Sequence, residues 1–130
     1  IVLEAIPVSN SSETQLITQS LLAKDIDVFF ALPDNVIFSS FETIVKACND
    51  KKIPVLTSEA GLVSRGALAS FGADMYQWGY QSGIQAVKLL KSGSKEGLQP
   101  EIVRVRKKVM SKRVAEKFKI TPDSSYTLVP

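Results

Sequence analysis

The stretch IDVFFALPDNVIFSSFETIVKACNDKKIPVLTSE, residues 26–59, decides the fold. Its first seven residues, Ile26 to Leu32, are rich in β-branched and aromatic side chains without a helical period, which predicts a short buried strand. From Val36 to Cys48 the apolar residues recur at the spacing of one helix face, and Ile53 to Thr57 predict a second strand. A strand, a helix and a strand at this spacing predict a βαβ unit with parallel strands and a right-handed crossover.

Polar residues follow both strands of this predicted unit. Asp34 and Asn35 come after the first strand, and Ser58 and Glu59 come after the second. The carboxyl ends of parallel strands meet at one edge of a sheet, where loop side chains and the free N–H groups of helix N-termini face the same crevice. We therefore expect these four residues side by side at this edge, which we call the rim.

The residues before this unit predict a third junction at the same rim. Ile1 to Val8 is β-prone, and the run Ser9-Asn10-Ser11-Ser12 follows it. Ser12 with Gln15 fits a capping box in front of a helix. The serine run therefore suits either a turn with a helix cap or one part of a ligand site.

The remainder of the chain continues the alternation of strands and helices. Asp74 with Gln77 repeats the cap pattern, and residues 102–110 alternate valines with charges as expected of an edge strand protected by charge. The expected elements are a strand at 67–71, a helix at 75–92, an edge strand at 102–110, a short helix capped by Ser111, and a turn-like end from residue 121. The predicted fold class is α/β, with a mainly parallel sheet flanked by helices.

Composition restricts the class of protein. A chain of 130 residues with 45% apolar content is long enough for one compact domain. No run approaches the roughly 20 apolar residues of a membrane helix, which predicts a soluble chain. The single cysteine, Cys48, lies on the predicted apolar helix face and is expected to be a buried thiol, and without histidine a zinc site is not expected. The opening residues lack the features of a signal peptide, so we expect either that a leader has been removed or that the chain begins within a longer protein.

The net charge of +3 is concentrated at the end of the chain. Residues 1–103 contain 8 basic and 11 acidic side chains, whereas residues 104–130 contain 8 basic and 2 acidic ones. A basic segment can bind nucleic acid through phosphates. Here the charges alternate with valines on a predicted strand and no aromatic platform accompanies them, so a solvated strand face is favoured and nucleic acid is not an expected partner.

The residues for catalysis are few. Histidine is absent, and none of the motifs G-x-x-x-x-G-K-[ST], G-x-G-x-x-G and G-x-S-x-G occurs. An enzyme using the carboxylate of Asp34 or Glu59 remains open, although nothing pairs the two for acid-base work. A phospho-acceptor receiver domain is disfavoured because its acidic cluster after the first strand is replaced by the serine run.

A binding crevice fits the predicted rim better than catalysis. Hydroxyls, carboxylates, amides and one aromatic ring are the mixture that orients a small zwitterion, because a carboxylate holds an ammonium group and hydroxyls with helix N-termini hold a carboxylate. The candidate ligand-binding residues are Ser9, Asn10, Ser11, Ser12, Asp34, Asn35, Ser58, Glu59 and Phe71. An amino acid would suit them. Capping of three helices is the alternative role for the same positions.

The sequence also resembles a known family. The stretches SNSSETQLITQSLL (9–22), FFALPDNVIFSSFETIVKACNDKKIPVLTSEAGLVSRGALASFGADMYQWGYQSGIQAVKLLKSG (29–93) and KKVMSKRVAEKFKI (107–120) resemble the later half of the solute-binding proteins of ABC transporters, in the tryptophan/tyrosine-type group. The resemblance covers nearly the whole chain. The sequence departs from the usual pattern at Leu32 and at Met75-Tyr76, which bears on the identity of the ligand.

The resemblance implies a type I periplasmic-binding-protein fold, in which two α/β lobes joined by three crossovers hold a ligand in the cleft between them. Residues 1–73 would then be the second-lobe α/β ligand-binding half, and residues 74–130 the crossover helix, edge strand and C-terminal helix. The N-terminal lobe would be missing from this chain, with self-association of the fragment as a consequence. Asp34 would hold the ligand ammonium group, and Ser9 to Ser12 with Glu59 would supply the remaining polar contacts.

The resemblance further implies an extracytoplasmic protein, in the periplasm or anchored as a lipoprotein. Its partners would be a small solute, with an amino acid favoured, and the permease of an ABC transporter; no cofactor and no catalysis are implied. The effector-sensing domain of a transcription regulator shares the two-lobed fold and stays open as an alternative, as does the carboxylate-using α/β enzyme.

Overall fold

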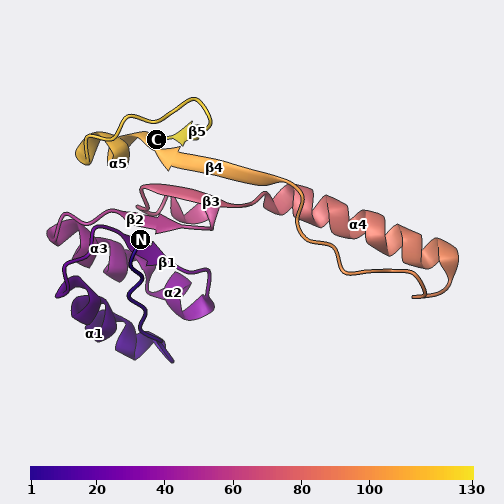
Figure 1. Cartoon of the computed structure of the whole chain (residues 1–130), viewed down its shortest axis with the longest axis horizontal. Helices are drawn as coiled ribbons and strands as arrows, with labels where there is room; N and C mark the ends of the chain where they lie inside the picture. Colours follow the sequence, from indigo (N-terminus) through magenta and orange to yellow (C-terminus); the bar gives the residue numbers. More distant parts are fainter.

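The computed structural model describes all 130 residues and contains one five-stranded sheet in the order β1-β2-β3-β4-β5 (Figure 1). The strands are β1 (Phe29–Ala31), β2 (Val55–Thr57), β3 (Ala69–Ala73), β4 (Arg106–Ser111) and β5 (Thr127–Val129). The helices are α1 (Ser11–Leu22), α2 (Asn35–Ser39), α3 (Phe41–Asp50), the 3-10 helix η1 (Ala60–Leu62), α4 (Met75–Ser92) and α5 (Lys112–Lys117). Helices lie on both faces of the sheet, so the predicted α/β class is confirmed.

The strand pairing confirms a mainly parallel sheet. β1 pairs with β2 and β2 with β3 in parallel, and β4 pairs with β5 in parallel. β3 and β4 are antiparallel, because the chain travels out along α4 and returns before it re-enters the sheet. The βαβ unit predicted from residues 26–59 is therefore present, with α2 and α3 in its crossover.

Side-chain caps fix the starts of three predicted helices. Asp34 accepts from the N–H of Val36 at the start of α2, and Asp74 accepts from the N–H of Gln77 at the start of α4. Ser111 begins α5, as expected. The single helix predicted from Val36 is wrong, because the chain breaks at Ser40, where φ is −110° and ψ is 9°, and continues as α3.

Three predictions near the chain ends are also wrong. Ile1 to Val8 is not a strand, because it carries none of the ladder bonds of the sheet. The edge strand is wrong for residues 109–111 of β4, which β5 covers, whereas the charged residues 106–108 pair with β3 alone and stay at an edge. The expected loose end from residue 121 contains β5 itself, whose three residues give too short an alternation to signal a strand.

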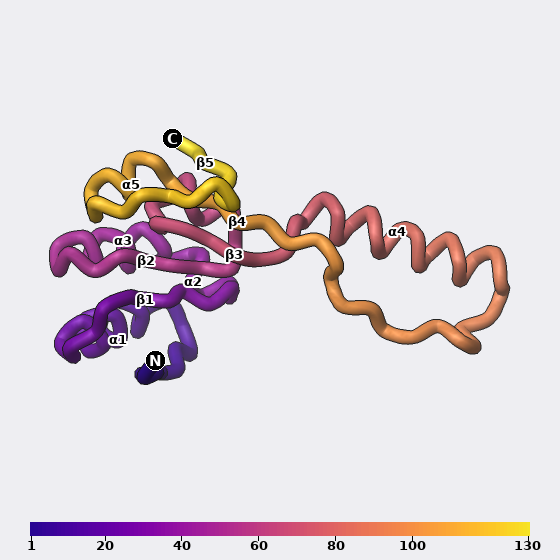
Figure 2. The backbone as a smooth tube through the Cα atoms, turned by 45° about the horizontal axis from the view of Figure 1, so that its top comes forward, coloured from indigo at the N-terminus to yellow at the C-terminus, as the bar shows by residue number.

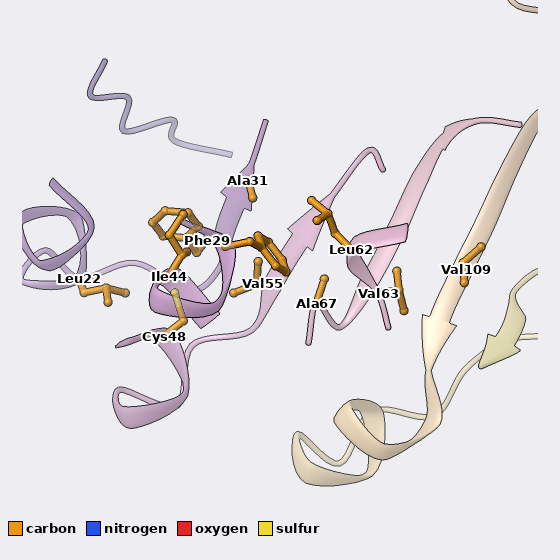
Figure 3. Close-up of a cluster of buried hydrophobic side chains, with 11 residues drawn as sticks. Leu22, Phe29, Ala31, Ile44, Cys48, Val55, Leu62, Val63, Ala67 and Val109 are labelled. Atoms are coloured by element: carbon orange, nitrogen blue, oxygen red, sulfur yellow. The ribbon is translucent and has the colours of Figure 1, made fainter. Parts of the chain in front are cut away.

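The larger core lies between the sheet and helices α1, α3 and η1 (Figure 3). Phe41 and Ile44 of α3 are fully buried there, and Phe29 and Val55 of the two neighbouring strands point into the same cluster. Cys48 is also buried in it, as predicted. A smaller cluster on the other face joins the sheet to α5 and contains Leu68, Ala69, Met110, Val114 and Ala115. We call the sheet with its packed helices the lobe.

Helix α4 extends away from the lobe, and residues 93–105 return alongside it (Figures 1 and 2). We call α4 with this return segment the arm. Gln81 donates to the carbonyl of Ile102 and accepts from the N–H of Arg104, which holds the return segment against the helix. No residue of α4 is buried. None of the helices combines the length and the hydropathy that crossing a bilayer requires.

Candidate ligand-binding site

The carboxyl ends of β1, β2 and β3 lie at the rim, where the sequence predicts the site. In the ladder, Ala31 pairs with Thr57 and Thr57 pairs with Ser70, so the three strands run side by side to this edge. The loops that contain Asp34 and Glu59 leave from neighbouring strand ends. The arm leaves from the end of β3, beside these two loops (Figure 2).

Asp34 is an exposed carboxylate, and one of its two oxygens accepts a hydrogen bond within the chain. Its Oδ1 accepts from the N–H of Val36 at 2.7 Å, which caps α2. Its Oδ2 has no hydrogen-bond or ion-pair partner within the chain and is free to accept from a ligand. Asn35, the first residue of α2, is exposed and its side-chain amide is also free. Capping and ligand binding are therefore compatible at this loop.

Ser58 and Glu59 lie in a loop that the neighbouring strand holds in place. The N–H of Glu59 donates to Thr57 Oγ1 at 3.2 Å, and Glu59 Oε1 accepts from the N–H of Gly61 at 3.0 Å. A Cβ added to Gly72 of β3 would lie 1.7 Å from the carbonyl oxygen of Ser58. Only glycine allows the two backbones to approach this closely. Both loop residues are half-buried, and Glu59 Oε2 is unpaired.

The helix cap in the serine run is Asn10, so the predicted capping box of Ser12 with Gln15 is wrong. Asn10 Oδ1 accepts from the N–H groups of Ser12 at 3.0 Å and Glu13 at 3.2 Å, and Asn10 Nδ2 donates to Glu13 Oε1 at 2.8 Å. Glu13 Oε2 also accepts from the N–H of Ser9. The amide of Asn10 is thus committed to the cap, and a short amide side chain serves this position as well as a hydroxyl.

The three serines of this run remain open to solvent. Ser9, Ser11 and Ser12 are exposed, and their hydroxyls make no hydrogen bond within the chain. They do not follow a strand of the sheet, contrary to the prediction from Ile1 to Val8. The start of α1 nevertheless lies at the same end of the lobe as α2, against which α1 packs (Figure 1).

Phe71 lies on β3 with half of its surface exposed. The guanidinium carbon of Arg106, on the adjacent strand β4, lies 5.9 Å from the centre of its ring. Side chains alternate along a strand, so Phe71 lies on the same sheet face as Ala69. Ala69 pairs with Leu56, and Leu56 pairs with Phe30, so Phe30 lies on this face as well. The ring is therefore on the face opposite α1 to α3 and close to the rim.

Two features of this region have no signal in the sequence. Phe30 is 51% exposed in the middle of β1, although its neighbours Phe29 and Ala31 are buried. Ser70 is buried beside Thr57, and its Oγ is the one buried side-chain polar atom without a hydrogen-bond partner. A serine within a strand and a phenylalanine within an apolar run carry no signal of either property.

The charges of the rim separate its carboxylates into two kinds. Asp74, at the end of β3, forms an ion pair of 2.7 Å with Lys107, and the hydrogen bond from Lys107 holds the pKa of Asp74 below its ordinary value. Asp34 and Glu59 have no cationic partner in the chain. These two are the rim carboxylates that an external cation can reach. No group of three or more acidic or thiol side chains is placed to hold a metal ion.

The comparisons with known proteins agree with this geometry. Residues 1–127 match the model of the family described as ABC transporter substrate binding protein. A tyrosine-binding protein of Clostridioides difficile is 42% identical over 87 residues, which are 67% of this chain and 25% of that protein. This chain thus spans about a quarter of the length of that curated relative.

Two solved structures share the fold. The ABC domain from Streptococcus pneumonia in complex with L-Trp superposes with a TM-score of 0.80 at 28% identity, over 97% of this chain and 44% of that one. A ligand-free, open structure of a substrate binding protein with adhesive properties from Clostridium difficile gives a TM-score of 0.72 at 27% identity, over 94% of this chain and 42% of that one. The match along almost the whole chain and the arrangement of its sheet lead to one conclusion: this chain belongs to the ABC transporter substrate-binding proteins.

Proposed function

We propose that the protein binds an amino acid, with an aromatic one favoured, in a cleft of which this lobe forms one wall. The single observation that carries the proposal is the rim itself, where two carboxylates without ion-pair partners lie in loops that leave neighbouring strand ends. The names of the tyrosine-binding relative and of the L-Trp complex support the choice of ligand.

Each part of such a ligand has a complementary group at the rim. Asp34 Oδ2 would accept from the ammonium group in a charge-assisted hydrogen bond, with Glu59 as a second carboxylate nearby. The free hydroxyls of Ser9, Ser11 and Ser12, at the positive end of α1, would donate to the ligand carboxylate. The free amide of Asn35 and the hydroxyl of Ser58 complete the polar set, whereas the amide of Asn10 holds the cap of α1 and so positions the serines. Phe71 offers an aromatic surface to the side chain.

The arm supports a second lobe as the opposite wall of the cleft. Large apolar side chains on α4 are exposed, among them Tyr76 at 77%, Tyr80 at 63% and Leu90 at 81%. An apolar surface of this extent along one helix indicates a packing partner. In this proposal residues 1–73 form most of the second lobe, and residues 74–130 contain the crossover helix that reaches the first lobe and the strand that returns from it.

The mechanism would be closure of the two lobes around the ligand. A ligand favours the closed state only through contacts that the open state lacks, so both walls must contribute. The loaded, closed form would deliver its solute to the permease of an ABC importer outside the cytoplasm, with a lipid anchor as one means of retention. The family match favours this transport role over the regulator and enzyme alternatives.

Titration calorimetry on the full-length protein tests the proposal. We expect heat of binding with L-tyrosine or L-tryptophan and weaker binding with small aliphatic amino acids. Replacing Asp34 by Asn removes the charge but keeps a good helix cap. Because hydrogen bonds to charged groups contribute about 1.5–3 kcal/mol, the D34N variant should bind roughly 10- to 100-fold more weakly.

The matched control is Asp27→Asn. Asp27 is an exposed carboxylate at the opposite end of β1 and makes no hydrogen bond in the chain, so its removal changes the net charge equally without touching the rim. Equal losses of affinity in D34N and D27N would exclude Asp34 as the ammonium ligand. Absence of heat with every amino acid tested would exclude the proposed ligand class.

A further inference from the structure

A cavity lies at the edge of the sheet opposite the rim. Its volume is about 210 Å³, it is open to solvent on one side, and it is lined by the C-terminal part of α3, the turn before β3 and one face of α5. Val45 and Val114 give it apolar walls. Three basic side chains also line it, those of Arg65, Arg113 and Lys117, and no carboxylate does. Because it lies at the opposite edge of the sheet, this cavity is not part of the proposed amino acid cleft at the rim.

Contacts within the lobe hold two of these cations in place. Arg65 Nε donates to Glu42 Oε1 at 2.7 Å, and Arg65 Nη2 donates to Glu42 Oε2 at 2.9 Å and to the carbonyl of Phe38 at 2.8 Å. Its Nη1 remains free. Lys117 Nζ donates to Asn49 Oδ1 at 2.7 Å, which leaves two of its three N–H donors available.

The third cation, Arg113, has no partner in the chain. It lies four residues before Lys117, so both side chains project from the same face of α5. Glu42 neutralises Arg65, but no acidic group balances Arg113 and Lys117 in ion pairs. The cavity therefore carries a local excess of two positive charges. Its free N–H donors are the whole guanidinium of Arg113, Nη1 of Arg65 and two N–H groups of Lys117.

We propose that this cavity binds a small oxyanion of the phosphate class. A tetrahedral dianion matches the charge excess, and arginine with lysine is the usual donor set for phosphate. A cavity needs only about 10–15 Å³ of such volume to hold one water molecule, so about 210 Å³ also admits a phosphate group with a few waters. The phosphate can be free or can belong to a small phosphate monoester, since both present the same oxygens.

Calorimetry and phosphorus NMR on the full-length protein test the site, with inorganic phosphate and glycerol 1-phosphate as probes. Ionic strength is held constant with sodium chloride, because general screening would otherwise imitate binding. We expect saturable binding that is independent of any amino acid in the cleft. Tighter binding of inorganic phosphate would identify the free anion as the ligand, and tighter binding of glycerol 1-phosphate would identify the esterified group.

Two variants separate the site from a general charge effect. Arg113→Gln should weaken phosphate binding about tenfold, since it removes the unpaired guanidinium. Lys112→Gln removes an equal charge from the neighbouring position of α5, which does not line the cavity, and should leave phosphate binding unchanged. Non-saturable binding, or equal losses in both variants, would overturn the proposal. Because the cavity and the rim are at opposite edges, amino acid affinity in R113Q should stay at the wild-type value.

Discussion

Asp74 and Lys107 form an ion pair of 2.7 Å at the root of the arm, where the chain leaves β3 for α4 and returns into β4. Only 8% of the Asp74 side chain is exposed, against 54% for Lys107. The N–H of Asp74 also donates to the carbonyl of Val105 at 3.0 Å. The two chains that connect the arm to the lobe are therefore tied together by one residue, which also caps α4.

Acid should weaken this connection. The hydrogen bond from Lys107 lowers the pKa of Asp74 from its ordinary value of 3.8, so the contribution to stability is present above 3.8 and is lost as the pH falls below it. Asp74→Asn keeps the cap and loses the ion pair, so its Tm should be lower than that of wild type near pH 7, with a difference that shrinks below pH 3.8. Thermal unfolding followed by circular dichroism between pH 7 and 3 measures the Tm of wild type and of D74N. A constant difference in Tm across that range would contradict a stabilising ion pair between Asp74 and Lys107.

Substitution of Gly72 should disturb the rim. The added Cβ of Gly72→Ala would lie 1.7 Å from the carbonyl oxygen of Ser58, which is backbone and cannot rotate away. We expect a loss of roughly 3 kcal/mol in the free energy of unfolding, as for severe overpacking, and weaker ligand binding because the loop of Glu59 must shift.

The matched control for this substitution is Gly79→Ala on α4. No atom lies within 4 Å of an added Cβ at Gly79 in this chain. In the 130-residue chain, G79A should therefore be stabilising, by up to ~1 kcal/mol, because alanine is the better helix former. Urea unfolding of both variants gives the two values. A G72A variant as stable as wild type would show that the close approach of β3 to Ser58 is not required.

Cys48 should resist thiol reagents in the folded protein. It is 1% exposed, and burial raises the pKa of its thiol to about 12. At pH 8 the thiolate that reacts is therefore scarce as well as shielded. Labelling with a chromogenic disulfide should follow the rate of unfolding and become immediate in 6 M guanidinium chloride. Complete labelling within seconds in native buffer would be inconsistent with the packed core around α3.

The exposed surface of α4 should cause the 130-residue chain to associate. Tyr80 and Ile84 lie one turn apart on this helix and are 63% and 44% exposed. We expect oligomers by light scattering after size exclusion, and a shift towards monomer for the double variant Y80E/I84E. The control is Leu16→Glu, because Leu16 is an isolated exposed apolar residue of α1, at 70%. Monomeric wild-type chain at 100 µM would contradict this expectation.

Strong local patterns carried the successful predictions of the fold. The apolar run before Asp34, the periodic residues around Ile44 and the cap at Asp74 each fix an element within a few residues of its observed bounds. The wrong predictions concern segments whose secondary structure depends on contacts with residues distant in the sequence. Residues 1–8 stay outside the sheet although the outer edge of β1 is unpaired, and β5 forms from three residues because β4 is already in place.

The site was partly predictable for the same reason. Parallel strand order places the loops of Asp34 and Glu59 at one edge without any knowledge of tertiary contacts. The spacing of residues in the sequence does not reveal that Asn10 caps α1 or that Asp74 is the neutralised carboxylate, because both depend on the folded geometry. Asp74 and Lys107, for example, are separated by the whole arm in sequence.

The pairing of Ala73 with Arg106 has a topological meaning. β3 and β4 are the two legs of a β-hairpin, and the arm is an insertion at its tip. The register of the sheet is therefore set by adjacent cross-strand partners and not by the 32 residues between them. Evolution, or a protein engineer, can lengthen, shorten or exchange that insertion while the hairpin keeps its alignment.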